Sequence, residues 1–174
     1  MRPGLAAETK SMIRVNQAGE YGATRIYAGQ LAVMGTRTPA ARAIAAMAAQ
    51  EDRHRRRFDA MIVERRVRPT LLAPLWDVAG FGLGMATALL GPKAAMACTA
   101  AVETEIDRHY GEQLDQLGTT DLELTEAIAD FRAEEVEHKA TALDHGAEGA
   151  FGYPVMSAVI RAGCRVAIAL SKRI

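Results

Sequence analysis

The sequence predicts an all-α protein: a bundle of four long helices, an apolar link between the second and third helices, and a further helix near the C-terminus. Three observations support this. Aromatic residues make up only 5% of the 174 residues while alanine is abundant, which favours closely packed helices. Glycine, proline and capping residues divide the chain into segments of helical length. No strand-like alternation of useful length appears. The length suits one domain, so we expect residues 1–174 to form a single domain.

Helix boundaries follow from local signals. Gly35 is placed to follow a helix C-terminus. Thr38 and Pro39 are typical of an N-cap and a first helical residue. Gly118 ends the third helix, and Thr120 opens the fourth with a capping box. The four helices are therefore expected at residues 10–34, 39–65, 92–117 and 121–145.

The link at residues 66–91 carries an unusual apolar run. Fifteen residues without a charge extend from Val78 to Pro92, preceded by Trp76. A transmembrane helix needs about 20 residues, so this run is too short to span a bilayer. We expect an apolar crossover hairpin that enters one leaflet, with Trp76 at headgroup level. A buried connector is the alternative.

The C-terminal segment supports the interfacial reading. Residues 155–172 are predicted to form an amphipathic helix that is apolar with basic edges. Together with the link, it offers more apolar surface than a small bundle readily covers. We therefore expect this helix to face a membrane.

Composition excludes two other classes of protein. The formal net charge is zero, which gives no general attraction for nucleic acid. The chain has only two cysteines, far apart and without a CxxC motif, so neither a disulfide framework nor a zinc ribbon is indicated.

Two of the four histidines occur in the same local pattern, a glutamate three residues before a histidine. The first copy is Glu51 and His54, and the second is Glu135 and His138. On a helix, residues three apart lie about 60° apart on one face, so both side chains can bind one cation. One such pair alone is weak evidence, since charged surface helices are rich in glutamate.

The two copies belong to a longer repeat. Glu20 and Glu103 lie 83 residues apart and precede the ExxH pairs by 31 and 32 residues, and the two histidines lie 84 residues apart. A lone Glu on each of two helices, with Glu-x-x-His on the other two, is the ligand set of ferritin-like di-iron bundles. Four carboxylates balance the charge of two divalent ions. Six ligands shared between the two ions leave open positions where O₂ can bind. The sequence thus predicts a ferritin-like four-helix bundle with a di-iron site.

Two further residues lie near this site. Tyr110 follows Glu103 by seven residues, which places both on one helix face two turns apart. A hydrogen bond near the substrate and a role in the core are equally compatible with that position. His109 points off this face, and His145 lies near a helix end, where we expect a structural role.

Several segments resemble the demethoxyubiquinone hydroxylases of ubiquinone biosynthesis, from about Ser11 to Ser171. They are "IRVNQAGEYGATRIYAGQLAVMG", "VRPTLLAPLWDVAGFGLGMATALLG", "AMACTAAVETEIDRHY", "EEVEHKATALDH" and "AGCRVAIALS". The resemblance implies a di-iron monooxygenase that hydroxylates the ring of a polyprenylated demethoxyubiquinol with O₂. It implies two Fe²⁺ ions, electrons from NADH, and the ligands Glu20, Glu51, His54, Glu103, Glu135 and His138.

The resemblance also bears on partners and location. The segment "DRHY" matches a family segment associated with quinone or electron delivery, which implies such a role for His109 and Tyr110. Some members have a lipid-binding companion protein. The sequence leaves a homo-oligomer open. The resemblance implies a peripheral protein on the cytoplasmic face of the bacterial inner membrane. If the chain is eukaryotic and already processed, we expect the matrix face of the mitochondrial inner membrane instead, because the N-terminal residues do not resemble a transit peptide.

Three alternatives stay open at this stage. One is another di-iron oxygenase or peroxidase with a soluble substrate. Another is a ferritin-like iron-binding or storage bundle, which would gain nothing from the apolar link and final helix. The third is a membrane-surface interaction module with a purely structural bundle, in which four inward carboxylates without metal would repel one another.

Overall fold

The computed structural model describes residues 3–174, with side chains from residue 7 on. Within these residues the chain forms α-helices and one short 3₁₀ turn, and no strand, which confirms the predicted all-α class. The elements are α1 (Pro3–Met34), α2 (Pro39–Glu64), α3 (Ala73–Leu89), α4 (Pro92–Leu117), α5 (Leu122–Asp144), η1 (Ala147–Gly149) and α6 (Tyr153–Ser171).

The chain divides into two compact units. The first holds the chain up to Leu89 together with Arg165–Ile174, and the second holds Leu90–Cys164. Each unit therefore contains one of the two predicted helical hairpins, α1–α2 or α4–α5, and α6 contributes residues to both. The single domain expected over residues 1–174 stays a prediction.

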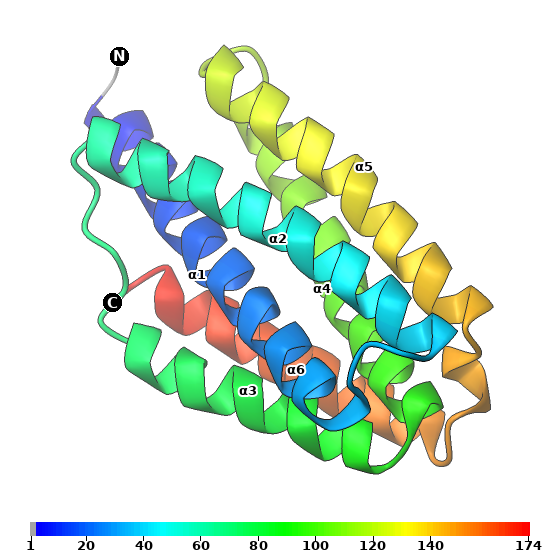
Figure 1. The fold of residues 1–174 in the computed structure, drawn as a ribbon. Coiled ribbons are helices and arrows are strands. Elements are labelled where there is room, and N and C mark those ends of the chain that lie inside the picture. Colours follow the sequence, from blue (N-terminus) through cyan, green and yellow to red (C-terminus); the bar gives the residue numbers. More distant parts are fainter. Residues whose placement is uncertain (1–2) are drawn as a thin grey trace. The chain divides into compact units, whose positions relative to one another are not determined.

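In the first unit, α1 and α2 form an antiparallel pair joined by a short turn (Figure 1). Gly35 has φ +64°, a left-handed conformation that glycine adopts without a Cβ penalty, as expected after a helix C-terminus. The hydroxyl of Thr38 accepts a hydrogen bond from the amide of Ala41 at 3.1 Å. This side-chain cap satisfies one of the first amides of α2, and the predicted boundary is confirmed.

The link between the hairpins differs from the prediction. We expected a hairpin within residues 66–91, but the structure has one continuous helix, α3, that packs along α1. Its glycines allow the two backbones to approach closely. A Cβ on Gly84 would lie 2.0 Å from the carbonyl oxygen of Ile26, and one on Gly29 of α1 would lie 2.2 Å from that of Phe81. Close packing against α1 therefore compensates the low helix propensity of these glycines.

Side-chain contacts also hold α3 against α1. The hydroxyl of Tyr21 donates a hydrogen bond to the Asp77 carboxylate at 2.8 Å, and this bond raises the pKa of Tyr21. Arg25 forms an ion pair with the same carboxylate and lies over the ring of Phe81, 5.0 Å from its centroid. These contacts set the register of the two helices.

In the second unit, α4 and α5 pack together. Gly118 ends α4 with φ +51°. The N-cap of α5 is Asp121, whose carboxylate accepts from the amide of Leu124 at 3.2 Å, so the cap lies one residue after the predicted Thr120. Residues 94–103 of α4 are all buried, on every face of the helix. The N-terminal half of α4 is therefore shielded from solvent on all its faces.

The helix α6 matches the predicted helix at residues 155–172 within two residues at each end. In the second unit, Arg161 of α6 donates to the Glu105 carboxylate of α4 at 2.8 Å. In the first unit, the indole of Trp76 donates to the hydroxyl of Ser171 at 3.0 Å. The polar side chains of α6 thus bind the helical bundle while its valines stay exposed.

Candidate metal centre

Three predicted ligands meet in the first unit. Glu20 comes from α1, and Glu51 and His54 come from successive turns of α2. All three are buried, and one ligand atom from each lies within 4.8 Å of the others. The Nδ1 atom of His54 lies 3.5 Å from Glu20 Oε2 and 4.0 Å from Glu51 Oε2. We call Glu20, Glu51 and His54 the first triad.

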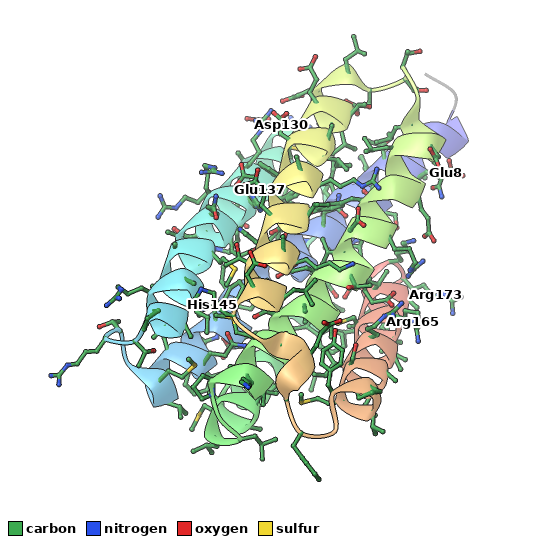
Figure 2. All side chains as sticks on the ribbon, turned by 90° about the vertical axis from the view of Figure 1, so that its right-hand side faces the viewer. Glu8, Asp130, Glu137, His145, Arg165 and Arg173 are labelled. Carbon is green, nitrogen blue, oxygen red and sulfur yellow. The ribbon has the colours of Figure 1, made fainter. Side chains whose placement is uncertain are left out.

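The second unit repeats this arrangement. Glu103 comes from α4, and Glu135 and His138 come from α5. Their ligand atoms also lie within 4.8 Å of one another, and His138 Nδ1 lies 3.2 Å from Glu135 Oε2. In contrast, Glu137 of the same helix is exposed (Figure 2). We call Glu103, Glu135 and His138 the second triad.

Burial distinguishes both triads from ordinary acidic surface groups. A buried carboxylate is costly unless it is paired, hydrogen-bonded or bound to a metal. In each triad the histidine turns Nδ1 towards the carboxylates, the orientation that a shared cation would require. Two carboxylates and one imidazole form a donor set that suits iron, and it lacks the thiolates of structural zinc sites. The residues therefore fit a metal centre.

The outward face of α2 is organised differently. Arg55 donates to Asp52 and Asp59, each at 2.7 Å, and Arg56 also forms an ion pair with Asp52. The hydrogen bond from Arg55 lowers the pKa of Asp52, and the same bond raises the pKa of Arg55. These partly exposed carboxylates are neutralised by arginine, whereas Glu51, one residue before Asp52, faces inward to the first triad.

Both predicted catalytic residues lie in α4 and are buried. Tyr110 is 1% exposed and His109 is 3% exposed, although helical spacing places His109 off the face that holds Glu103. Their rings are stacked, with centroids 6.4 Å apart. The Nε2 atom of His109 lies 2.7 Å from the Nε2 atom of Gln113, so the side-chain amide restrains the imidazole.

Sequence reasoning missed several buried polar residues of α4, two of which have side-chain hydrogen bonds. One is Gln113, whose signal was the four-residue spacing from His109. The other is Glu105, which is fully buried and accepts from Arg108 at 2.9 Å and from Arg161 at 2.8 Å. The remaining histidine, His145, is the C-cap residue of α5, in line with the expected structural role (Figure 2).

Comparison with known proteins identifies relatives over nearly the whole chain. The family described as "Ubiquinone biosynthesis protein COQ7" matches residues 7–171. The chain is 51% identical over 172 residues to a "3-demethoxyubiquinol 3-hydroxylase" of Rhodospirillum rubrum, covering 99% of this chain and 81% of the relative.

Two eukaryotic relatives also match nearly the whole chain. A Homo sapiens protein named "NADPH-dependent 3-demethoxyubiquinone 3-hydroxylase, mitochondrial" is 52% identical over 172 residues, covering 97% of this chain and 79% of the relative. The "5-demethoxyubiquinone hydroxylase, mitochondrial" of Saccharomyces cerevisiae is 43% identical over 185 residues, covering 97% and 79%.

Proposed function

The chain belongs to the COQ7 family of ubiquinone biosynthesis proteins, and from this premise we propose that it hydroxylates the ring of demethoxyubiquinol. It is thus an oxidoreductase, a 3-demethoxyubiquinol 3-hydroxylase of ubiquinone biosynthesis. The observation that carries this function is the pair of buried triads, each with two carboxylates and one histidine, in a chain that matches the family over residues 7–171.

The metal in this proposal is iron. Glu20, Glu51 and His54 would hold one ion, and Glu103, Glu135 and His138 the other. Four carboxylates neutralise two divalent charges, which offsets the cost of burying them. When bound, a pair of irons supplies activation of O₂ and insertion of one oxygen atom into the ring. The shielding of residues 94–103 by the surrounding protein would exclude bulk water from the second triad.

Tyr110 and His109 are proposed to act on the quinol. The Tyr110 hydroxyl would donate a hydrogen bond to a ring oxygen and orient the ring. His109, restrained by Gln113, would hold or transfer a proton during electron delivery. We expected NADH as the electron source, whereas several relatives are named NADPH-dependent. The two nucleotides should therefore be compared directly.

A membrane surface is proposed to supply the polyprenylated substrate. By length and composition alone, α6 could cross a bilayer, and 11% of its most apolar 18 residues are buried. Its Val155 is 70% exposed, and Val78 and Leu89 of α3 are each 71% exposed. Exposed apolar side chains on these two helices support interfacial, peripheral binding, with the isoprenoid tail in the bilayer. A lipid-binding companion protein would bind the same kind of surface.

The site is tested by iron binding and product analysis. We expect about two irons per wild-type chain after anaerobic loading with Fe(II). Glu135→Ala and His54→Ala should each lose most of this iron while staying helical by circular dichroism. Glu137→Ala, on the exposed face of α5, is the matched control and should bind iron normally. Full iron occupancy in both ligand variants would refute the assignment.

The reaction is tested with ¹⁸O₂, a reductant and demethoxyubiquinol. The product should gain one labelled oxygen atom over repeated turnovers, with NADH and NADPH compared as reductants. Glu103→Ala should abolish the product, and Tyr110→Phe should slow its formation by roughly 10–100-fold. Accumulation of many ferric ions per chain with unmodified quinol would indicate a storage protein instead, and label from water would also refute the hydroxylase.

The membrane surface is tested by flotation with anionic vesicles. Replacing Val78 and Leu89 with Glu should move the protein to the soluble fraction, because charge opposes insertion. Val63→Glu is the matched control, since Val63 is 77% exposed but lies on α2. The control should stay bound to the vesicles. If the Val78 and Leu89 variant also stays bound, α3 is not the membrane-binding helix.

A further inference from the structure

Thr99 carries a buried hydroxyl group that is not part of the proposed ligand set. It lies in α4, one turn before Glu103, and is 1% exposed. Its Oγ1 atom is buried and makes no hydrogen bond within the described part of the chain. Other helical threonines bond the preceding turn: Thr104 donates to the carbonyl of Ala100 at 2.7 Å, and Thr87 donates to that of Leu83 at 2.9 Å.

A buried hydroxyl without a hydrogen bond lowers the stability of the folded chain. A hydroxyl in an apolar interior loses its bonds to water, and without a protein partner that loss is not recovered. A helical threonine can avoid this cost by adopting the rotamer that bonds the carbonyl three or four residues earlier. Thr99 does not, and valine would fill the same volume without a hydroxyl. An unbonded buried hydroxyl is therefore expected where it serves a ligand.

Helix geometry places this hydroxyl beside the second triad. Residues four apart share a face, and each Cα–Cβ bond tilts towards the N-terminus of the helix. The side chain of Glu103 therefore leans over the turn that holds Thr99. The Glu103 carboxylate in turn lies within 4.8 Å of ligand atoms of Glu135 and His138. With Tyr110 two turns further on, α4 presents a buried polar stripe of Thr99, Glu103 and Tyr110.

We infer that the Thr99 hydroxyl donates a hydrogen bond to a small oxygen-bearing or anionic ligand that binds beside Glu103. The inference rests on the proposed function, because that function brings such ligands to the triad. Two sources share this chemistry: a small inorganic ligand of the iron site, and a ring oxygen of the quinol. In either case the hydroxyl positions the ligand and does not hold the metal.

The first arm of the test uses metal-free protein and thermal unfolding. Thr99→Val removes an unsatisfied hydroxyl without changing the shape of the side chain, so the Tm should rise by roughly 2–8 °C. Thr104→Val is the matched control in the same helix; it removes a bonded hydroxyl, so its Tm should not rise. A lower Tm for Thr99→Val would show that the hydroxyl has a partner in the protein, and would overturn the inference.

The second arm uses iron-loaded, oxidised protein titrated with azide and followed by absorbance. Thr99→Val should weaken azide binding by roughly tenfold, the loss expected for a hydrogen bond to a charged ligand. Thr99→Ser keeps a hydroxyl and should restore most of the affinity, whereas Thr104→Val should bind as the wild type does. This result would show that the Thr99 hydroxyl donates its hydrogen bond to the small inorganic ligand.

The third arm tests whether the hydroxyl binds a ring oxygen of the quinol instead of the small inorganic ligand. If azide binding is unchanged but the KM for demethoxyubiquinol rises about tenfold in Thr99→Val, the hydroxyl binds the ring oxygen. If neither azide affinity nor KM changes, the inference is wrong. A wild-type protein that binds iron and azide but makes no hydroxylated quinol would refute the proposed function alone. Failure of the wild type to bind iron would also refute that function, while the metal-free Tm comparison would still test the unsatisfied hydroxyl.

Discussion

The ion pair between Glu105 and Arg161 should stabilise α6 measurably, because it joins a side chain of that helix to a buried carboxylate of α4. Glu105 is fully buried and accepts from two arginines, Arg161 at 2.8 Å and Arg108 at 2.9 Å. The two arginine side chains are 40% and 41% exposed, so solvent screens part of each interaction. We therefore take the lower end of the range for hydrogen bonds to charged groups, about 1.5 kcal/mol each.

Glu105→Ala removes both bonds and should lower the free energy of unfolding by about 3 kcal/mol. For a chain of this length, 1 kcal/mol corresponds to roughly 2–4 °C in Tm, so the Tm should fall by about 6–12 °C. Arg161→Ala removes one bond and leaves Glu105 paired with Arg108, which should cost about half as much. The measurement is urea or thermal unfolding of wild type, both single variants and the double variant.

The double variant decides whether the pair is the cause. It should be hardly less stable than Glu105→Ala alone, because Arg161 has no carboxylate to bind once Glu105 is removed; the coupling energy should be about 1.5 kcal/mol. Additive losses from the two single changes would refute the reasoning, since they would mean that each residue acts through other contacts. An unchanged Tm for Glu105→Ala would refute it as well.

Three further outcomes follow from the first unit. Gly84→Ala should cost about 1–3 kcal/mol in urea unfolding, because its Cβ would lie 2.0 Å from a carbonyl oxygen of α1; Gly82→Ala, with no atom within 4 Å, should gain about 0.5–1 kcal/mol, and equal effects would refute the close packing. The raised pKa of Tyr21 should fall in Asp77→Asn, so one tyrosine titrates at lower pH in ultraviolet absorbance. Since the folded-state pKa is the higher one, the stabilising effect is complete below about pH 10 and is lost as the pH rises through the folded pKa; an unchanged titration would contradict this. Trp76 is the sole tryptophan of the sequence, so its emission should shift to the blue when anionic vesicles bind, and no shift would argue against α3 at the interface.

Local signals in the sequence determined most of the fold. Gly35, Thr38 and Gly118 mark helix ends because their effects act within one turn, through backbone conformation and side-chain caps. The proposed ligand residues could also be recognised in the sequence, because a helix brings residues three apart onto one face whatever surrounds it. The 84-residue repeat of the two histidines then paired the halves, and each triad does gather in its own unit.

Other features depend on contacts between residues far apart in the sequence. The apolar run of the link was predicted to form a hairpin that enters one leaflet, but close packing on α1 makes it one helix. In the sequence, nothing distinguishes Glu105 from a surface carboxylate. In the folded structure it is buried and pairs with Arg161, 56 residues later. Thr99 could have bonded its own helix, and only the folded structure shows that its hydroxyl does not. Burial and side-chain pairing are properties of packed neighbours, so the tertiary structure alone decides them.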